Sequence, residues 1–228
     1  MLRHESDMAA VATAWLRSAG LQVKAEFVSP WGICDLVGLS FNQISVATRL
    51  RLRQTKAVSS ITRAALLLRI PDEDQKRSIT LDGLVRQCAP AVSEQVARDE
   101  IERLIADRFV VRTARGRLQR KNGWVPLQER LVAIELKLSR VEEAMRQARS
   151  NLGFADESYV ALPADVAHAV ASRSSRYAQF FASGVGVLAV TRHRCEVVAP
   201  ARGMGAWKDE VAQFYCVEKF WRTRIKGN

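Results

Sequence analysis

The chain has 228 residues and is strongly basic, with a formal net charge of +11 at pH 7. Its length allows one large domain or a domain with a second module inside it, and 48% hydrophobic residues suffice for a sizeable core. The charge favours a polyanionic partner, with nucleic acid first and an acidic membrane surface second. A charge that only aids solubility, or a bias of composition towards arginine, is the alternative explanation.

The cysteines and the N-terminal residues bear on where in the cell the protein is expected to lie. The cysteines form no CxxC pair and no close Cys/His spacing, which argues against a structural zinc site. Cys34, Cys88 and Cys195 lie among apolar neighbours, as small core residues do, which favours a reducing environment. Acidic Glu5 and Asp7 precede any apolar stretch, unlike a signal peptide, and no run approaches the ~18 apolar residues of a membrane helix. We therefore expect a cytoplasmic protein without a membrane partner. The cysteines are Cys34, Cys88, Cys195 and Cys216.

The first part of the chain predicts a helix followed by two strands. Apolar residues at helical spacing cover residues 4–19, and Gly20 ends that helix. Residues 21–28 alternate as a strand, and a turn at residues 29–32 leads into a second strand over residues 33–41.

From about Ser45 to Pro126 the pattern changes to helices followed by a hairpin. The longest of these helices begins at the cap Ser93, with Val96, Ile101, Leu104 and Ile105 facing inward. Three helices and a β-hairpin are typical of a winged helix-turn-helix module. We interpret residues 45–126 as an insertion into a parent domain formed by residues 1–44 and 127–228. The expected elements are helices at 57–70, 80–88 and from 93, and strands at 109–113 and 117–120.

The parent domain then resumes as alternating strands and helices. We expect strands at residues 131–138, 158–162, 185–190 and 195–198, and helices at residues 141–152, 165–172, around 177–181 and 207–221. This order predicts an α/β fold.

Charged residues lie inside two of the apolar strands. Glu135 and Lys137 stand two residues apart in the run 131–138, so both point to the same side of a sheet. Charge in such a strand is costly unless it is paired or binds a metal. Asp35 lies within the upstream run 33–39. Two acids and one lysine are the parts needed to hold a divalent cation and position a water, as in phosphodiester cleavage.

These residues resemble the motif of the PD-(D/E)XK nuclease superfamily. The resemblance rests on Asp35, on Glu135-Leu136-Lys137 and on Gln147 in the following helix, and Glu5 on the first helix extends it. It covers residues 1–44 and 127–200. Cys34 departs from the motif, which has proline there. The resemblance implies a restriction-endonuclease-like mixed sheet flanked by helices, here with an inserted winged helix-turn-helix subdomain.

The resemblance also implies a role for each residue. Asp35 and Glu135 would bind Mg²⁺ or Mn²⁺, with Glu5 as an outer metal ligand or a residue that positions water. Lys137 would orient the attacking water or offset charge, and Gln147 would orient a ligand or contact the nucleic-acid backbone. The alternatives are an exposed cross-strand ion pair for Glu135 and Lys137, an acid favoured by the helix dipole for Glu5, and a solvated side chain for Gln147.

The insertion carries much of the positive charge. Residues 50–121 contain 16 Lys/Arg and 9 Asp/Glu, a net charge of +7. The helix at residues 93–107 has a net charge of −3, so we do not expect it to read sequence in a major groove. A basic surface at the start of the first inserted helix (Arg51, Arg53, Lys56 and Arg63) could extend the contact. The hairpin residues expected to contact phosphates are Arg108, Arg112, Arg115, Arg117, Arg120 and Lys121.

The sequence thus predicts a metal-dependent nuclease that hydrolyses phosphodiester bonds, with DNA before RNA as its substrate. One alternative is a non-catalytic DNA-binding or regulatory protein on the same fold. Another is a protein-interaction module that docks through the inserted domain. A homodimer stays open as well.

Overall fold

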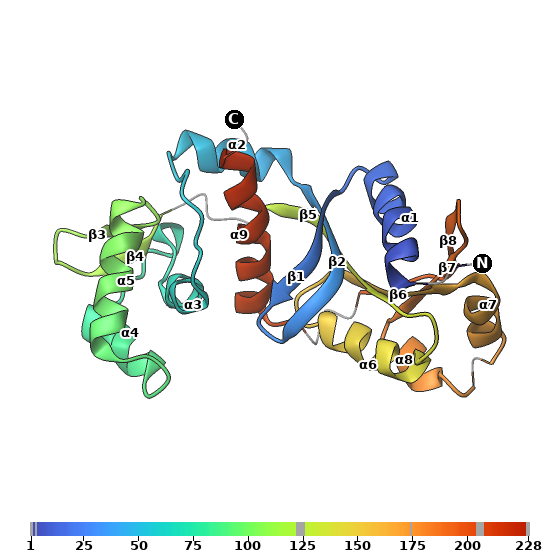
Figure 1. Ribbon diagram of the computed structural model, residues 1–228. Coiled ribbons are helices and arrows are strands. Elements are labelled where there is room, and N and C mark those ends of the chain that lie inside the picture. The colour runs from blue at the N-terminus through green and yellow to red at the C-terminus, as the bar shows by residue number, and fades with distance from the viewer. Residues whose placement is uncertain (1, 3, 122–125, 174, 204–207, 227–228) are drawn as a thin grey trace. The chain divides into compact units, whose positions relative to one another are not determined.

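The computed structural model divides the chain into two compact units (Figure 1). The first comprises Met1–Ser40 and Gln128–Gln213, and the second comprises Phe41–Leu127 and Phe214–Asn228. The sequence placed everything after residue 127 in one domain, whereas the structure assigns the final segment to the second unit. The residues described are 2, 4–121, 126–173, 175–203 and 208–226.

The first unit is built on a mixed sheet. Among the described residues, six strands form it in the order β1-β2-β5-β6-β7-β8. The β5, β6 and β7 strands are parallel, while β1 pairs antiparallel with β2 and β7 pairs antiparallel with β8. The strands are β1 (Gln22–Ser29), β2 (Gly32–Phe41), β5 (Gln128–Leu136), β6 (Glu157–Pro163), β7 (Gly186–Val190) and β8 (Cys195–Ala199); the helices are α1 (Glu5–Ser18), α6 (Val141–Asn151), α7 (Ala164–Ser172) and α8 (Ala178–Ala182).

Helices cover both faces of this sheet, which makes the unit α/β as expected. Met8, Ala12 and Leu16 recur every four residues on α1, so one stripe of that helix packs on Ile134 and Leu136. On the other face α6 packs with α7 and α8 over β6 and β7. Side chains alternate along a strand, so Glu135 points away from the α1 face and towards α6.

Backbone strain lies beside Asp35. The β1–β2 pairing passes from Ala25 with Leu36 to Phe27 with Cys34, so Glu26 and Asp35 fall between these pairs. Glu26 has a φ of 47°, a left-handed conformation that is uncommon for a residue other than glycine. Strain of this kind gathers at functional sites, which directs attention to Asp35.

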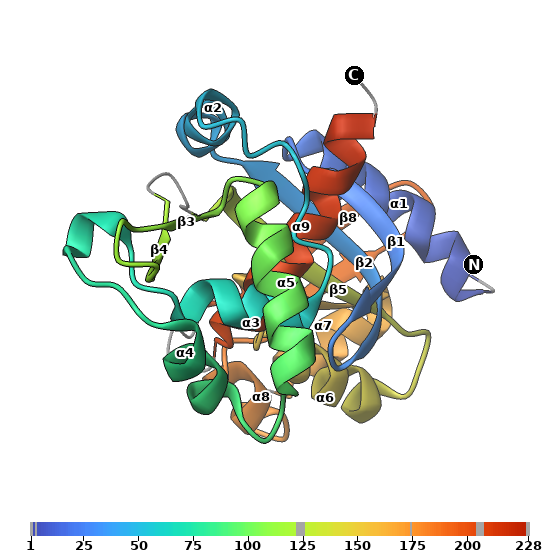
Figure 2. The ribbon, with the colours of Figure 1, turned by 90° about the vertical axis from the view of Figure 1, so that its left-hand side faces the viewer.

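The second unit consists of helices and a two-stranded hairpin (Figure 2). Its α3 helix packs against α5 and α4, and the side chains of Ser60, Thr80 and Ser93 cap these three helices at their N-termini. Its elements are α2 (Gln43–Arg51), α3 (Ile61–Arg69), the short 3₁₀ helix η1 (Glu73–Gln75), α4 (Leu81–Cys88), α5 (Glu94–Ala106), β3 (Val110–Arg112), β4 (Leu118–Arg120) and, from Phe214 onward, α9 (Glu210–Lys226).

A buried ion pair ties α9 to the rest of the second unit. Arg49 on α2 is only 1% exposed, and its guanidinium donates to both carboxylate oxygens of Glu218, with Nη2 2.9 Å from Oε2. The guanidinium also lies 5.0 Å from the ring centre of Phe109 and 4.8 Å from that of Trp221. The backbone N–H of Val58 donates to the same carboxylate at 2.7 Å. These contacts explain why the last helix belongs to this unit.

Several local expectations were wrong. The structure adds helix α2, which the sequence did not predict, and α3 begins at Ile61 rather than residue 57. Val96 on α5 is 45% exposed instead of facing inward, while Ile101 and Leu104 are buried as expected. Strand β5 ends at Leu136, so Lys137 follows the strand. Across the described ranges, no helix combines the length and apolar character that a membrane span requires.

Candidate active site

A hydrogen bond joins Asp35 to the segment that carries Glu135 and Lys137. The Oδ2 atom of Asp35, on β2, accepts from the backbone N–H of Leu136 on β5 at 2.7 Å. Leu136 is the middle residue of the Glu-x-Lys sequence, so residues 101 positions apart meet where two neighbouring strands run side by side. The expected convergence of this acid with that segment is present in the structure.

Glu135 is buried in the first unit. Its residue is 2% exposed, and Asn151 Nδ2 at the end of α6 donates to its Oε1 at 2.6 Å. Burial raises the pKa of Glu135 to about 7, and the charge of Asp35 adds to the rise, while the bond from Asn151 and the charge of Lys137 oppose it. This carboxyl can therefore gain or lose a proton near neutral pH.

Lys137 and Glu5 form an ion pair that is more exposed than Glu135. The Lys137 Nζ is 3.8 Å from Oε2 of Glu5, the first residue of α1. The Lys137 side chain is 12% exposed and that of Glu5 is 43% exposed. The backbone N–H of Lys137 donates to the carbonyl of Ala161 on β6 at 3.1 Å, which fixes the start of the lysine side chain. The ammonium is thus held beside an acid that solvent can reach.

Two amide side chains on α6 share one helix face. Gln147 and Asn151 are four residues apart, a spacing that places them one turn from each other on the same side. The buried Gln147 Oε1 has no hydrogen-bond partner among the described residues. A buried acceptor without a donor is costly, so this oxygen suits a water or a ligand donor. Sequence reasoning named Gln147 and missed Asn151.

Cys34 lies against the same carboxylate. Its Sγ is 3.5 Å from Asn151 Nδ2 and 3.5 Å from the Ile134 carbonyl. Burial first, and then the charge of Glu135, raises the pKa of the Cys34 thiol well above its usual value. A neutral buried thiol is a poor nucleophile, so Cys34 acts here as a small packing residue.

Asp35 and Glu135 are the acids of this site that could hold a divalent cation. Within the described ranges, no group of three or more His, Cys, Asp and Glu side chains is arranged to hold a metal. Asp35 and Glu135 each use one carboxylate oxygen for the hydrogen bonds above. Mg²⁺ commonly takes only one or two carboxylates and completes its shell with waters and substrate phosphates. Glu5 instead pairs with Lys137, which favours an outer position over direct ligation.

Internal contacts engage half of the expected phosphate-binding residues of the hairpin. Arg112 pairs with Glu102 of α5, and Arg120 lies 3.7 Å from Asp72. Arg117 donates from Nε to Ser78 Oγ at 2.8 Å and from Nη2 to its carbonyl at 2.6 Å. The remaining members of the set are Arg108 and Arg115, which are exposed, and Lys121, which is partly buried. Acids remote in sequence therefore offset part of the positive charge that the hairpin sequence shows.

The second expected basic surface does not form on one helix. Arg63 on α3 pairs with Glu100 and lies 4.0 Å from Asp107 of the acidic segment. Arg51 ends α2, while Arg53 and Lys56 lie in the connection before α3. The acids of α5 thus serve partly as partners for buried or half-buried arginines of the same unit.

Comparison with known proteins assigns no activity. No family model matches the chain, and no curated protein matches it. A solved structure of a protein of unknown function from Silicibacter pomeroyi is similar with a TM-score of 0.45 and 13% sequence identity, over 99% of this chain and 89% of that chain. The function has to be argued from the site.

Proposed function

We propose that the protein is a metal-dependent nuclease that hydrolyses phosphodiester bonds in nucleic acid, with DNA before RNA as substrate. One observation carries the proposal: the Asp35 carboxylate accepts a hydrogen bond from the backbone N–H of Leu136, the residue between Glu135 and Lys137. The two acids lie close enough for the charge of Asp35 to raise the pKa of Glu135, and Lys137, which follows β5, is near enough for its charge to lower that pKa. The net charge of +11 suits a polyanionic substrate.

Each residue has a task in this proposal. Asp35 and Glu135 would hold Mg²⁺ or Mn²⁺, and such an ion, when bound, polarises the scissile phosphate and lowers the pKa of a bound water. Lys137 orients the attacking water and offsets the negative charge that develops on the phosphate oxygens. Glu5 keeps the Lys137 ammonium in place, Asn151 orients Glu135, and Gln147 Oε1 accepts a hydrogen bond from a bound water.

The architecture supports the same proposal. The element order of helix, strand, acid-bearing strand, Glu-x-Lys strand and helix agrees with a restriction-endonuclease-like fold. In the second unit, helices α3, α4 and α5 are followed by the β3–β4 hairpin, and an isolated bridge joins Ile79 to Leu118 of β4. This pattern supports a winged-helix module that holds substrate.

Cleavage by two site variants tests the proposal. Wild-type protein with Mg²⁺ or Mn²⁺ is expected to cut DNA, and Glu135→Gln and Lys137→Ala should each lower the rate by about a thousandfold or more, because they remove a metal ligand and a charge-stabilising group. Nuclease assays on gels measure the rates, and circular dichroism checks that both variants fold. The matched control is Glu129→Gln, which changes an exposed acid near the opposite end of β5. Cleavage that survives both site variants would end the proposal.

A non-catalytic nucleic-acid-binding protein is the second candidate. The observation that favours it is the pairing of Lys137 with Glu5, since such an ion pair can exist without a catalytic role. Calorimetry with Mn²⁺ separates the two functions. The nuclease requires a binding site that Glu135→Gln weakens, whereas the second candidate binds DNA in a salt-dependent way without binding the ion.

A further inference from the structure

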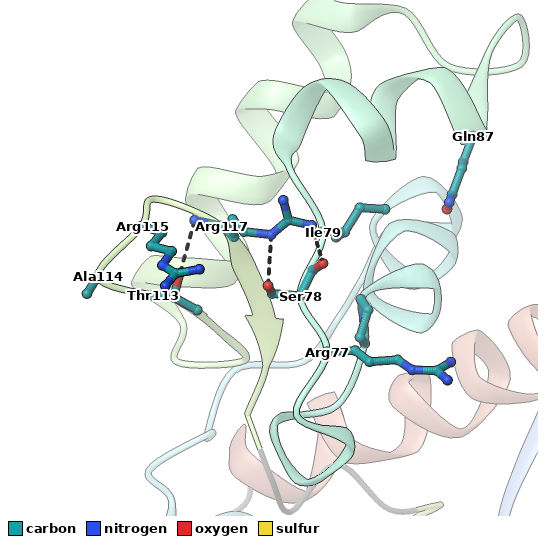
Figure 3. Close-up of a pocket in the computed structure, with 9 residues that line it drawn as sticks. Arg77, Ser78, Ile79, Gln87, Thr113, Ala114, Arg115 and Arg117 are labelled. Atoms are coloured by element: carbon teal, nitrogen blue, oxygen red, sulfur yellow. Dashed lines mark hydrogen bonds between the residues drawn. The ribbon is translucent and has the colours of Figure 1, made fainter.

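The second unit contains a cavity with three arginines and no acid among its lining residues. Its volume is about 730 Å³, and it lies between the β3–β4 turn, the segment before α4 and α4 itself (Figure 3). Arg115 and Arg117 come from the hairpin and Arg77 from the segment before α4. Sequence reasoning named the two hairpin arginines but gave no role to Arg77.

The centre of the cavity wall is fixed in place. Arg117 donates twice to Ser78, once to the hydroxyl and once to the carbonyl, and the backbone N–H of Arg117 donates to the Thr113 hydroxyl at 3.2 Å. Figure 3 shows these bonds as dashed lines, with Arg115 and Arg77 on either side of the Arg117–Ser78 pair. Arg115 and Arg77, on either side of this fixed pair, are both exposed residues.

The cavity also offers apolar surface and further polar groups. Pro71, Ile79 and Ala114 supply apolar contacts, and the Gln87 side-chain amide can donate and accept hydrogen bonds. The volume lies in the range of ordinary small-molecule sites, which is more room than a lone phosphate needs. A ligand with a phosphate at one end and a flat apolar group at the other matches this combination.

We propose that this cavity binds one nucleotide unit of a nucleic-acid strand, with Arg115 and Arg77 contacting successive phosphates. Arginine forks match phosphate oxygens in two-point hydrogen bonding, and here neither fork faces a carboxylate of the cavity wall. The base rests on Pro71 and Ile79. The inference deepens the proposed function, because it rests on a nucleic-acid substrate and says where the second unit holds it.

The test measures binding alone. The full chain is titrated into fluorescently labelled oligo(dT) in EDTA, so that no cleavage takes place, and anisotropy is followed at several salt concentrations. Arg77→Ala and Arg115→Ala are each expected to weaken binding and to reduce the slope of log K against log salt by about 0.7, the value for one lost phosphate contact on a single strand. Arg86→Ala is the matched control, since it removes an exposed arginine of α4 that does not line the cavity.

Three results would overturn the inference. The first is a slope that the two cavity variants leave unchanged, and the second is a slope that falls equally in the Arg86→Ala control. The third is displacement of oligo(dT) by polyglutamate of equal charge, which would assign the cavity to acidic protein segments. Competition by thymidine monophosphate more strongly than by inorganic phosphate is expected.

The inference and the nuclease proposal can fail separately. If Arg77→Ala and Arg115→Ala leave the salt slope unchanged while the wild-type protein still cleaves DNA, the cavity does not bind the strand and the nuclease proposal stands. If the two cavity variants change the salt slope but the wild-type protein never cleaves, the cavity binds nucleic acid and the non-catalytic candidate is favoured.

Discussion

Glu135 shows what a single buried side chain determines. It is enclosed, bonded to Asn151 and close enough to Asp35 to feel its charge. A carboxyl in this position is stable when protonated and becomes useful for binding a cation when ionised. The same burial that would make the residue reactive therefore costs stability at neutral pH and above.

This cost predicts a pH-dependent difference in stability. The unfolded carboxyl loses its proton near pH 4.5 and the folded one near pH 7, so unfolding releases a proton between these values. Wild-type stability should fall, relative to that of Glu135→Gln, as the pH rises from about 4.5 to about 7, and then level off. The full difference is on the order of 3 kcal/mol.

Paired urea or thermal unfolding of wild type and Glu135→Gln at a series of pH values measures this difference. Because the other titrating groups are the same in both proteins, their effects cancel. A difference that stays constant across the window would show that Glu135 ionises normally in the folded chain.

The sequence drew attention to the charged residues of the candidate site but not to the polar residue that hydrogen-bonds one of them. Asp35, Glu135 and Lys137 stood out because charges interrupt apolar runs. Asn151 did not, because an asparagine near a helix end reads as an ordinary terminal residue. Its role comes from a contact with a strand that precedes it, and only the packed structure shows that contact.

At the scale of elements, regular patterns were predicted well and polar ones poorly. The strands of the first unit and helices α1, α4 and α6 follow from periodicity and caps. Helix α2 was missed because it is short and carries three β-branched residues, Ile44, Val46 and Thr48, which have low helix propensity. The hairpin looked wholly basic because its acid partners, Glu102 and Asp72, lie outside it.

Close packing between strands gives a prediction for β7. A methyl group at Gly186 would lie 2.5 Å from the ring of Tyr159 and 2.6 Å from the backbone nitrogen of Ala201. Because backbone cannot yield as a side chain can, Gly186→Ala should lower the free energy of unfolding by about 1–3 kcal/mol. Chemical denaturation measures the loss.

Gly38→Ala on β2 is the comparison. A methyl group there meets only leucine side chains, those of Leu16 and Leu21, at 3.1–3.2 Å. We expect a smaller loss, since these side chains can shift. Equal losses at the two positions would contradict the packing argument.

At the scale of the whole molecule, both compact units are made from separated stretches of chain. The sequence suggested an insertion but misplaced the final helix. Nothing local in residues 214–226 indicates which unit they join. The contact that joins the last helix to the second unit is between Arg49 and Glu218, which are 169 positions apart.

This pair predicts a selective loss of stability. Arg49→Ala leaves Glu218 buried without its cation and should cost about 3–5 kcal/mol. Arg49→Met combined with Glu218→Leu should restore only part of this, because the backbone N–H of Val58 still loses its acceptor. The loss is expected for the second unit, whereas Glu135→Gln alters the first. Hydrogen exchange read by mass spectrometry assigns each effect to its unit. Failure of the double variant to recover stability would show that the pair does more than balance charge.

The distance between Arg49 and Glu218 along the chain has a consequence for synthesis on the ribosome. Translation proceeds from the N-terminus, so the arginine emerges long before its carboxylate exists. Until residue 218 has left the exit tunnel, the nascent polypeptide carries an unneutralised guanidinium in what will become an interior. The second unit is therefore completed late, and a ribosome that stalls before that point leaves it open to chaperones and proteases.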